Sequence, residues 1–259
     1  MVNMLKKQKN IIKVENPRQI APLYQDWQET MIYSYLDGYK GSAYASCAIA
    51  PTSAMIIIGD FCFFAGVPNI HLIKNIHQDF CILSYDNQEW EKLIEGYYQT
   101  KVSKHQRYAL LKEREVFDLQ LLENNVQQLS GQYSLQKINQ YIYQQLLRDE
   151  WSCDLCSCFD SYEEYQQYGL GYVICKGDLI VSGASSYTYY RDGIEIEIDT
   201  HPHYRRQGLA RVVASQLILT CLQQNKYPSW DAHNQQSLAL AMSLGYHFDC
   251  AYPVYLLKK

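Results

Sequence analysis

The sequence predicts an α+β protein in which a mixed sheet is flanked by helices. Two observations support this prediction. Residues 171–200 contain three strand-like runs separated by short turns, which is typical of an antiparallel meander. An apolar helical run follows the third of these strands, and short strands and helices then alternate to the end of the chain. Mixed runs of strands and helices of this kind are typical of α+β folds.

The first half of the chain contains elements that are separated by proline and glycine. Apolar spacing predicts one helix from about Pro22 to Asp37 and another over residues 88–98. Residues 104–122 are predicted either to pass from strand to helix or to be helical. Short β-branched or aromatic runs predict strands over residues 43–50, 54–58, 60–65 and 80–85. We therefore expect residues 1–130 to form an N-terminal α+β domain, whose role no motif indicates.

The second half, residues 131–259, is predicted to form the other domain. A strand over residues 133–138 precedes helices over 139–148 and 161–168. The meander strands are expected at 171–175, 179–187 and 194–200, with turns at 176–178 and 191–193. The remaining elements are a helix that ends near residue 222, a strand over 227–233, a helix over 237–244 and a strand over 248–257.

The segment Ile194–Ala210 joins an acidic strand to the start of a helix. Isoleucine occupies positions 194, 196 and 198, and a carboxylate occupies 195, 197 and 199, so the two kinds of side chain alternate. His201-Pro202 ends the strand, and the run from Arg205 to Ala210 opens the helix. The first turn of a helix has unpaired N–H groups and a partial positive charge, which favour a phosphate. Gly208 permits close approach of such an anion, and the neighbouring arginines add charge.

The elements after this junction follow a specific order. A strand is followed by Asn234 as a turn or N-cap, by a short helix, by Leu244-Gly245-Tyr246 and by a final strand. Together with the acidic strand and the R-x-x-G-x-A loop, this order resembles the acetyl-CoA-binding core of the GNAT N-acetyltransferase superfamily. The segments GIEIEIDTHPHYRRQGLA and YPSWDAHNQQSLALAMSLGY, with GDFCFFAGVP at residues 59–68, are similar to the GNAT subfamily named after zwittermicin A resistance acetyltransferases.

The resemblance implies a GNAT fold for residues 131–259 and acetyl-CoA as the cosubstrate. It implies that the diphosphate binds to the backbone amides of residues 207–210. The pantetheine arm would pair with the backbone of residues 198 and 200 as an added strand. The expected cofactor-binding residues are Ile198, Thr200, Arg205, Arg206, Gln207, Gly208, Leu209, Ala210, Asn234 and Ser237.

Glu195 and Glu197 are the candidate general bases. In a GNAT-like fold this strand is central, so its carboxylates would face the acceptor cleft. Crowded carboxylates in a partly dry cleft raise at least one pKa towards neutrality, which suits a base that deprotonates an ammonium group. The alternation does not show which of the two glutamates is the base. Asp199 is the weaker candidate, because it lies nearer to the R-x-x-G-x-A loop. In an arbitrary sequence, the same carboxylates would form the solvated face of a half-exposed strand.

The last short helix leaves the general acid open. Many GNAT enzymes carry a tyrosine four residues before its glycine, whereas this chain has Ala241 there. The acid is therefore absent, replaced by another residue such as Tyr246 or Tyr252, or unnecessary because a thiolate is a fair leaving group. Asn234 and Ser237 also suit a simple helix cap, with or without contact to the cofactor.

Composition excludes several other classes of protein. The net charge is −4, and the charged side chains are spread along the chain, so the sequence predicts no basic surface that would bind nucleic acid. Apolar runs are too short to span a membrane, and residues 1–10 lack the apolar segment of a signal peptide, so we expect a cytoplasmic protein. The nine cysteines indicate reduced thiols, several of them inside apolar strands. We expect no metal site, because the cluster Cys153-x-x-Cys156-x-Cys158 has no second ligand pair.

We therefore expect an acetyl-CoA-dependent N-acetyltransferase that acts on a primary amine of a small molecule. An antibiotic-like amine is suggested by the name of the subfamily. Two alternatives stay open. The chain could be a non-catalytic acyl-CoA sensor, which Ala241 permits and the acidic strand argues against, or an interaction scaffold whose N-terminal half recruits a protein. No motif encodes the acceptor or an oligomeric state.

Overall fold

A computed structural model describes residues 11–259 of the chain. It contains two compact units, one formed by the residues up to 106 together with 253–259, and the other by residues 107–252. Two strands, β6 (Val102–Leu110) and β13 (Phe248–Lys258), run through the boundaries. The predicted boundary near residue 130 lies inside the second unit. The expectation that no signal peptide is present concerned residues 1–10, which lie outside the described part.

The first unit contains a sheet in the order β1-β2-β3-β4-β5-β13, in which β4 and β5 are parallel and the other neighbours for which register is given are antiparallel. Its strands and helices are β1 (Ile12–Lys13), η1 (Pro17–Gln19), η2 (Ala21–Tyr24), α1 (Thr30–Leu36), β2 (Ser42–Ala45), β3 (Ser53–Ile58), β4 (Phe61–Gly66), α2 (Ile70–Lys74), β5 (Phe80–Tyr85), α3 (Gln88–Tyr98) and η3 (Gln99–Lys101).

Helices α2 and α3 cover one face of this sheet through a buried apolar cluster. Trp90 of α3 packs on Phe64 of β4 with ring centroids 4.7 Å apart, and both side chains are fully buried. The indole N–H of Trp90 donates to the carbonyl oxygen of Gly66 at 2.9 Å, at the end of β4. Gly66 has φ +79, and a Cβ there would lie 2.3 Å from the Thr52 carbonyl oxygen, so only glycine fits this strand end.

Two sequence predictions for the first unit are corrected by the structure, and one short helix was missed. The helix expected from Pro22 is a 3-10 turn followed by the shorter α1, because Glu29 caps the N–H of Met31 and starts the helix there. The strand expected over residues 43–50 ends at Ala45, and a turn follows it. Helix α2, which Asn69 caps, was not predicted, since five residues are too few to show helical periodicity.

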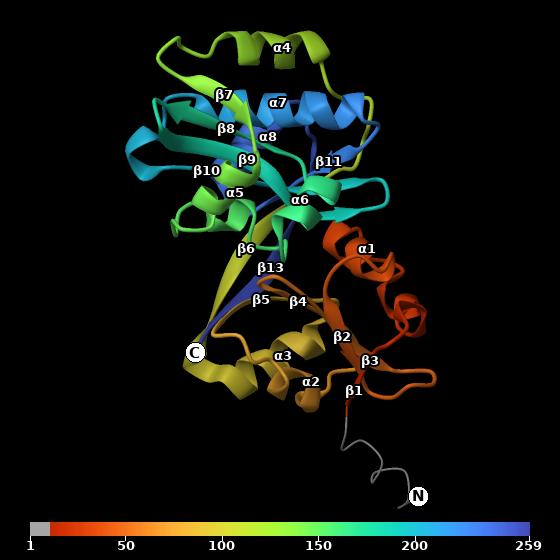
Figure 1. The fold of residues 1–259 in the computed structure, drawn as a ribbon. Helices are drawn as coiled ribbons and strands as arrows, with labels where there is room; N and C mark the ends of the chain where they lie inside the picture. The colour runs from red at the N-terminus through yellow and green to blue at the C-terminus, as the bar shows by residue number, and fades with distance from the viewer. Residues whose placement is uncertain (1–10) are drawn as a thin grey trace, which may run out of the picture. The chain divides into compact units, whose positions relative to one another are not determined.

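The second unit is built on a sheet in the order β11-β10-β9-β8-β7. Helix α7 covers one face with α4 outside it, and α5 and α6 lie on the other face (Figure 1). Its elements, besides the parts of β6 and β13, are α4 (Leu119–Gln127), β7 (Ser134–Lys137), α5 (Gln140–Leu146), η4 (Cys153–Leu155), α6 (Tyr162–Tyr168), β8 (Gly171–Lys176), β9 (Leu179–Tyr190), β10 (Gly193–Thr200), η5 (Pro202–Tyr204), α7 (Leu209–Gln223), β11 (Tyr227–Ser229), β12 (Asp231–Ala232) and α8 (Gln235–Met242).

Helix α4 belongs to this second unit because it packs directly on α7. The Asn125 amide of α4 donates to the Ser215 hydroxyl of α7 at 3.1 Å, and Leu122 joins the core of this unit. The sequence analysis placed residues 119–127 in the N-terminal domain, since no local pattern reports which helix a given helix packs on. Within the described residues, no helix has both the length and the apolar character that crossing a membrane requires.

The strand predicted over residues 227–233 is wrong, because it is two short strands in different pairings. Strand β11 runs parallel to β10 only as far as the pair Glu195 and Ser229. The chain then turns at Trp230, and β12 pairs antiparallel with β6. Trp230 is buried, and its indole N–H donates to the Ser237 hydroxyl at 3.2 Å, which fixes the turn. Among the described strands, none therefore pairs with this edge of β10 beyond Glu195.

Candidate active site

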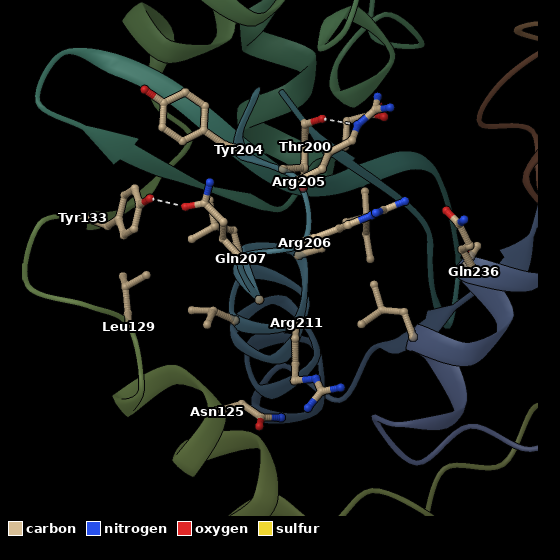
Figure 2. A pocket seen from close by; sticks show the side chains of 18 of the residues that line it. Asn125, Leu129, Tyr133, Thr200, Tyr204, Arg205, Arg206, Gln207, Arg211 and Gln236 are labelled. Carbon is tan, nitrogen blue, oxygen red and sulfur yellow. Dashed lines mark hydrogen bonds between the residues drawn. The ribbon is translucent and has the colours of Figure 1, made fainter. Parts of the chain in front are cut away.

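A cavity of about 750 Å³ lies where β10 ends and α7 begins. All ten residues that the sequence analysis assigned to cofactor binding line it, and so does Asp199. Glu195 and Glu197 are not among the lining residues. Figure 2 shows the cavity with Leu129 and Tyr133 on one side and Gln236 on the other. The volume lies in the range of small-molecule sites. The structure thus brings the predicted residues together, and their role in binding stays a prediction.

The N-terminus of α7 forms one wall of the cavity. The helix begins at Leu209 rather than at Arg205, and its first helical bond runs from the Val212 N–H to the Gly208 carbonyl at 3.2 Å. No side chain caps this end, so the amides of the first turn are available to an anion. Arg205, Arg206 and Arg211 also line the cavity. The wall therefore has the chemistry of a phosphate site.

The loop before α7 contains two residues in the left-handed backbone region. Gly208 has φ +81 and Arg206 has φ +61. A Cβ on Gly208 would have no atom within 4 Å, so the protein itself leaves space at this position. The backbone conformation, which side chains with a Cβ adopt at a cost, is the first reason for glycine there. The space is open to an approaching ligand.

The edge of β10 forms a second wall. The His201 N–H donates to the Val181 carbonyl of β9 at 3.0 Å, so alternation along an antiparallel strand directs the N–H groups of residues 198 and 200 to the other side. On that side, the Ile198 N–H donates to the Glu197 carboxylate at 3.2 Å. The Arg205 Nε donates to the Thr200 carbonyl at 3.1 Å, as Figure 2 shows. The backbone that was predicted to receive the pantetheine arm is therefore an unpaired strand edge.

The start of α8 supplies a third wall. The Oδ1 atom of Asn234 accepts the Ser237 N–H at 2.8 Å, so the cap predicted from sequence is present. Because Oδ1 is used in this bond, the amide nitrogen of Asn234 faces His233 Nε2 at 2.7 Å and donates to it. His233 is then neutral with its proton on Nδ1. Burial and the nearby Arg107 lower the pKa of His233, which agrees with the neutral form.

Carboxylates gather beside this edge. Burial, and then the charges of Asp199 and Asp154, raise the pKa of Glu197 to about 8, whereas Arg107 and the Ile198 N–H lower it. Burial and Asp154 raise the pKa of Asp199 to about 6, against the effect of Arg205. The direction agrees with the predicted rise towards neutrality, but burial contributes more to it than the crowding of like charges. Asp154, in η4, was not predicted, because only the cysteines of that segment form a recognisable pattern.

Glu195 has a different environment from Glu197. Its side chain is 4% exposed, and its Oε1 atom accepts the Asp231 N–H at 2.9 Å. Burial, and to a lesser extent the charge of Glu195, raises the pKa of the half-buried Tyr190 and of the buried Tyr227, so the carboxylate lies near these two aromatic side chains. Opposite this part of β10, the register of β9 shifts between the partners of residues 195 and 196. The structure therefore gives Glu195 and Glu197 different environments, a difference that the alternation in the sequence does not show.

Asp231 is the centre of a hydrogen-bonded network next to Glu195. The Arg107 Nε donates to Asp231 Oδ1 at 2.6 Å, and the Tyr252 hydroxyl donates to Oδ2 at 2.8 Å. The side chains of Arg107 and Asp231 are 13% and 10% exposed, so the ion pair is largely shielded from water. The pairing of Arg107 with Asp231 was not predicted, because the two residues are 124 positions apart and no motif contains both.

Helix α4 and the segment after it complete the cavity, a contribution that the sequence analysis also missed. The Tyr133 hydroxyl donates to the Gln207 side chain at 2.7 Å and ties this segment to the loop before α7 (Figure 2). The sequence of α4 shows only the spacing of polar residues that any exposed helix has, so it did not indicate that α4 lines a cavity. The residues contributed are Asn125, Gln128, Leu129, Ser130 and Tyr133.

The two tyrosines considered as replacements for a general acid do not line the cavity. Tyr246 is buried and donates to the Pro228 carbonyl at 2.6 Å, and burial raises its pKa far above the ordinary value. Tyr252 is bonded to Asp231. Ala241 is fully buried in the core. Among the described residues, no group of three or more histidine, cysteine or acidic side chains is arranged to hold a metal ion.

Comparison with known proteins gives the family and the fold of this chain. Residues 21–255 match the family described as GNAT acetyltransferase. A crystal structure of a GCN5-related N-acetyltransferase-like protein from Streptococcus suis is 42% identical, has a TM-score of 0.91, and the match covers 94% of this chain and 99% of that chain. The uncharacterized N-acetyltransferase YdfB of Bacillus subtilis is 28% identical over 252 residues, 87% of this chain and 89% of that protein. A putative GNAT acetyltransferase from Novosphingobium aromaticivorans shares the fold alone, at 16% identity, a TM-score of 0.52 and coverage of 92% and 96%.

Proposed function

The chain belongs to the GNAT acetyltransferase family, and on that premise we propose that it transfers the acetyl group of acetyl-CoA to a primary amine of a small molecule. The family assignment makes it an acyl-transferring enzyme. The observation that carries the proposal is the cavity, which combines an uncapped helix N-terminus, an unpaired strand edge and a carboxylate with a raised pKa beside it.

Acetyl-CoA, as the cosubstrate, supplies the acyl group as a thioester. The first-turn amides of α7 would hold the diphosphate, and Arg205, Arg206 and Arg211 add positive charge around it. The backbone of Ile198 and Thr200 would pair with the pantetheine arm, since no described strand occupies that edge. The positive charge and the strand edge without a partner strand therefore support binding of acetyl-CoA in this cavity.

Glu197 is the base in this proposal. Its pKa near 8 leaves a useful ionised fraction at neutral pH and gives a carboxylate strong enough to accept a proton from an ammonium group. Glu195 is bonded to the Asp231 N–H and serves to hold β12 against β10. Asp199 lines the cavity and keeps Glu197 basic through its own charge.

Backbone donors would assist the remaining steps. An N–H group on the open edge of β10 is suited to stabilise the negative charge that develops on the thioester oxygen when the amine attacks. No side-chain acid is assigned to the leaving thiolate, because Tyr246 and Tyr252 are bonded elsewhere and do not line the cavity. A thiolate is a sufficiently good leaving group for this scheme. Transfer is direct, and no cysteine carries the acetyl group.

Two observations bear on the acceptor. The segments GIEIEIDTHPHYRRQGLA and GDFCFFAGVP are similar to the subfamily named after zwittermicin A resistance acetyltransferases, which supports an antibiotic-like amine. Among the described side chains that affect the pKa of Glu197, Asp199 and Asp154 are acidic, and their charge favours a cationic amine near the base.

The test is acetyl-CoA consumption, followed as release of free thiol, across a panel of amines, amino acids and aminated antibiotics. The proposal expects turnover with at least one primary amine and a matching N-acetylated product by mass spectrometry. Tight binding of acetyl-CoA without acetylation of any amine in the panel would instead indicate an acyl-CoA sensor.

A further inference from the structure

Two backbone groups on the open edge of β10 are hydrogen-bonded to side chains of nearby residues. The Ile198 N–H donates to Oε1 of Glu197 at 3.2 Å, and the Thr200 carbonyl accepts from Nε of Arg205 at 3.1 Å. An unpaired strand edge normally presents such groups to any strand that can pair with them. Here the first group is a donor and the second an acceptor, and side chains of opposite charge satisfy them.

An extended ligand that pairs with this edge needs the same two groups. A strand added to a sheet gains its affinity from main-chain hydrogen bonds, and one N–H cannot serve a carboxylate and a ligand carbonyl at full strength together. The bonds to Glu197 and Arg205 therefore compete with the pantetheine arm. The register supports this point, because β11 pairs with β10 only up to Glu195 and leaves residues 198 and 200 beyond its end.

We propose that Glu197 and Arg205 cap the edge of β10, and that the pantetheine arm of acetyl-CoA displaces both, so that the base is released toward the acceptor only after the cosubstrate has bound. This inference rests on the proposed function. It adds a regulatory contact to that site, since the residue that performs the proton transfer also guards the backbone on which the cosubstrate lies.

Each displaced side chain keeps a role after its release. Arg205 lines the cavity with Arg206 and Arg211, so its guanidinium remains near the phosphates. Glu197 loses a hydrogen bond that favours its ionised form. The charged groups whose fields act on its carboxyl are Asp199 on the same strand, Asp154 on η4 and Arg107 on β6. Release therefore makes the ionised form of Glu197 a stronger base towards the ammonium group of the acceptor.

Proton uptake on cosubstrate binding reports this release. A carboxylate that loses a stabilising N–H has a higher pKa, so at a pH near that pKa the protein takes up part of a proton. Desulfo-CoA is a suitable probe, because it carries the pantetheine arm and the phosphates and has no thiol that titrates near pH 8. Calorimetry at pH 8 in two buffers of different ionisation enthalpy gives the number of protons taken up.

We expect a measurable fraction of a proton for the wild type and for Asp178→Asn, a control in the turn between β8 and β9. Glu197→Gln removes the titrating group and should show none. Absence of uptake in the wild type, while desulfo-CoA binds, overturns the inference and leaves the proposed function standing. Failure of desulfo-CoA to bind the folded wild-type protein would instead remove the proposed cosubstrate site.

Two variants of Glu197 separate the effect of its hydrogen bond to the Ile198 N–H from the effect of its negative charge. Glu197→Gln and Glu197→Ala both lose the negative charge, but only glutamine retains an oxygen that can accept the Ile198 N–H. Desulfo-CoA should bind to Glu197→Ala roughly 3- to 10-fold more tightly than to Glu197→Gln, the value of about one hydrogen bond. If both variants are folded, as judged by thermal unfolding, and bind desulfo-CoA with equal dissociation constants, then the residue 197 side chain does not compete with the ligand for the Ile198 N–H, and the inference is wrong.

Discussion

The Oε1 atom of Glu195 accepts the backbone N–H of Asp231 at 2.9 Å, just where β10 and β11 separate. Glu195 is the last residue of β10 that pairs with β11, and Asp231 is the first residue of β12. The bond thus holds the turned chain next to the strand it has left. Because this carboxylate is bonded to backbone and Glu197 lies further along the open edge, the two glutamates are expected to respond differently to mutation.

Replacing each glutamate by glutamine tests the assignment of the base. Glu197→Gln should lower kcat by roughly 100-fold or more while acetyl-CoA still binds, because the amide cannot accept a proton. The loss should shrink as pH rises, since more of the amine then arrives neutral. Glu195→Gln retains an oxygen for the Asp231 N–H and should keep turnover within about 3-fold of the wild type. Steady-state rates with a confirmed acceptor decide this, and the reverse pattern would make Glu195 the base.

The raised pKa of Glu197 also predicts a pH dependence of stability. Its pKa is about 8 in the folded chain and near 4.5 ordinarily, so between these values the unfolded chain binds fewer protons than the folded chain. Stability therefore falls as pH rises through this window. Glu197→Gln removes that cost and should raise the melting temperature by roughly 2–5 °C at pH 8.5, and by much less at pH 5. A melting-temperature difference that is the same at both pH values would contradict the raised pKa.

Two substitutions of Gly208 separate backbone strain from ligand approach. Asparagine adopts the left-handed conformation at φ +81 with little strain, whereas valine is strained there by about 1–3 kcal/mol. We expect Gly208→Val to lower the melting temperature of the free protein and Gly208→Asn to change it little. Both side chains would occupy the space in front of the helix, so both should lose most of the thermal shift that acetyl-CoA produces. A full shift in Gly208→Asn would show that close approach to this residue is not needed.

Arg107 should set the pH range of activity through Glu197. The guanidinium lowers the pKa of Glu197, so Arg107→Met should move the acidic limb of the kcat/KM profile upward by about 0.5–1 pH unit. Arg107→Lys retains the positive charge and should leave the limb nearly in place. Both variants weaken the ion pair with Asp231, so a common loss of stability is expected from thermal unfolding. Equal pH profiles for methionine and lysine would show that the charge does not act on the base.

The hydrogen bond between Tyr133 and Gln207 predicts a contribution to cosubstrate affinity alone. Tyr133→Phe removes the hydroxyl that ties the segment before β7 to the loop before α7. The substitution should raise the KM for acetyl-CoA by about 2- to 5-fold with little change in kcat. Tyr141→Phe is the matched control, because Tyr141 is exposed on α5 and does not line the cavity. An equal effect of the two substitutions would exclude a specific role for Tyr133.

Much of the second unit could be predicted from local signals. The turns at residues 176–178 and 191–193 separate the three meander strands, and the helix over 209–223 follows its apolar run. The same signals placed the ten expected cofactor residues at a strand end, a helix start and a cap, and these elements meet at one cavity. This worked because each signal depends on residues only a few positions apart. The resemblance to a known family supplied the expectation that the elements meet.

The alternation of isoleucine and carboxylate, and the glycine before α7, were determined by the sequence itself, because strand period and left-handed backbone are local properties. Tertiary structure alone decided which glutamate is bonded to Asp231 and which lies with Asp154 and Asp199, since burial and charge depend on residues far away in the chain. It also decided that α4 packs on α7 and that the chain turns at Trp230. Electrostatic interaction and packing act through space, and the linear order of residues does not record those distances.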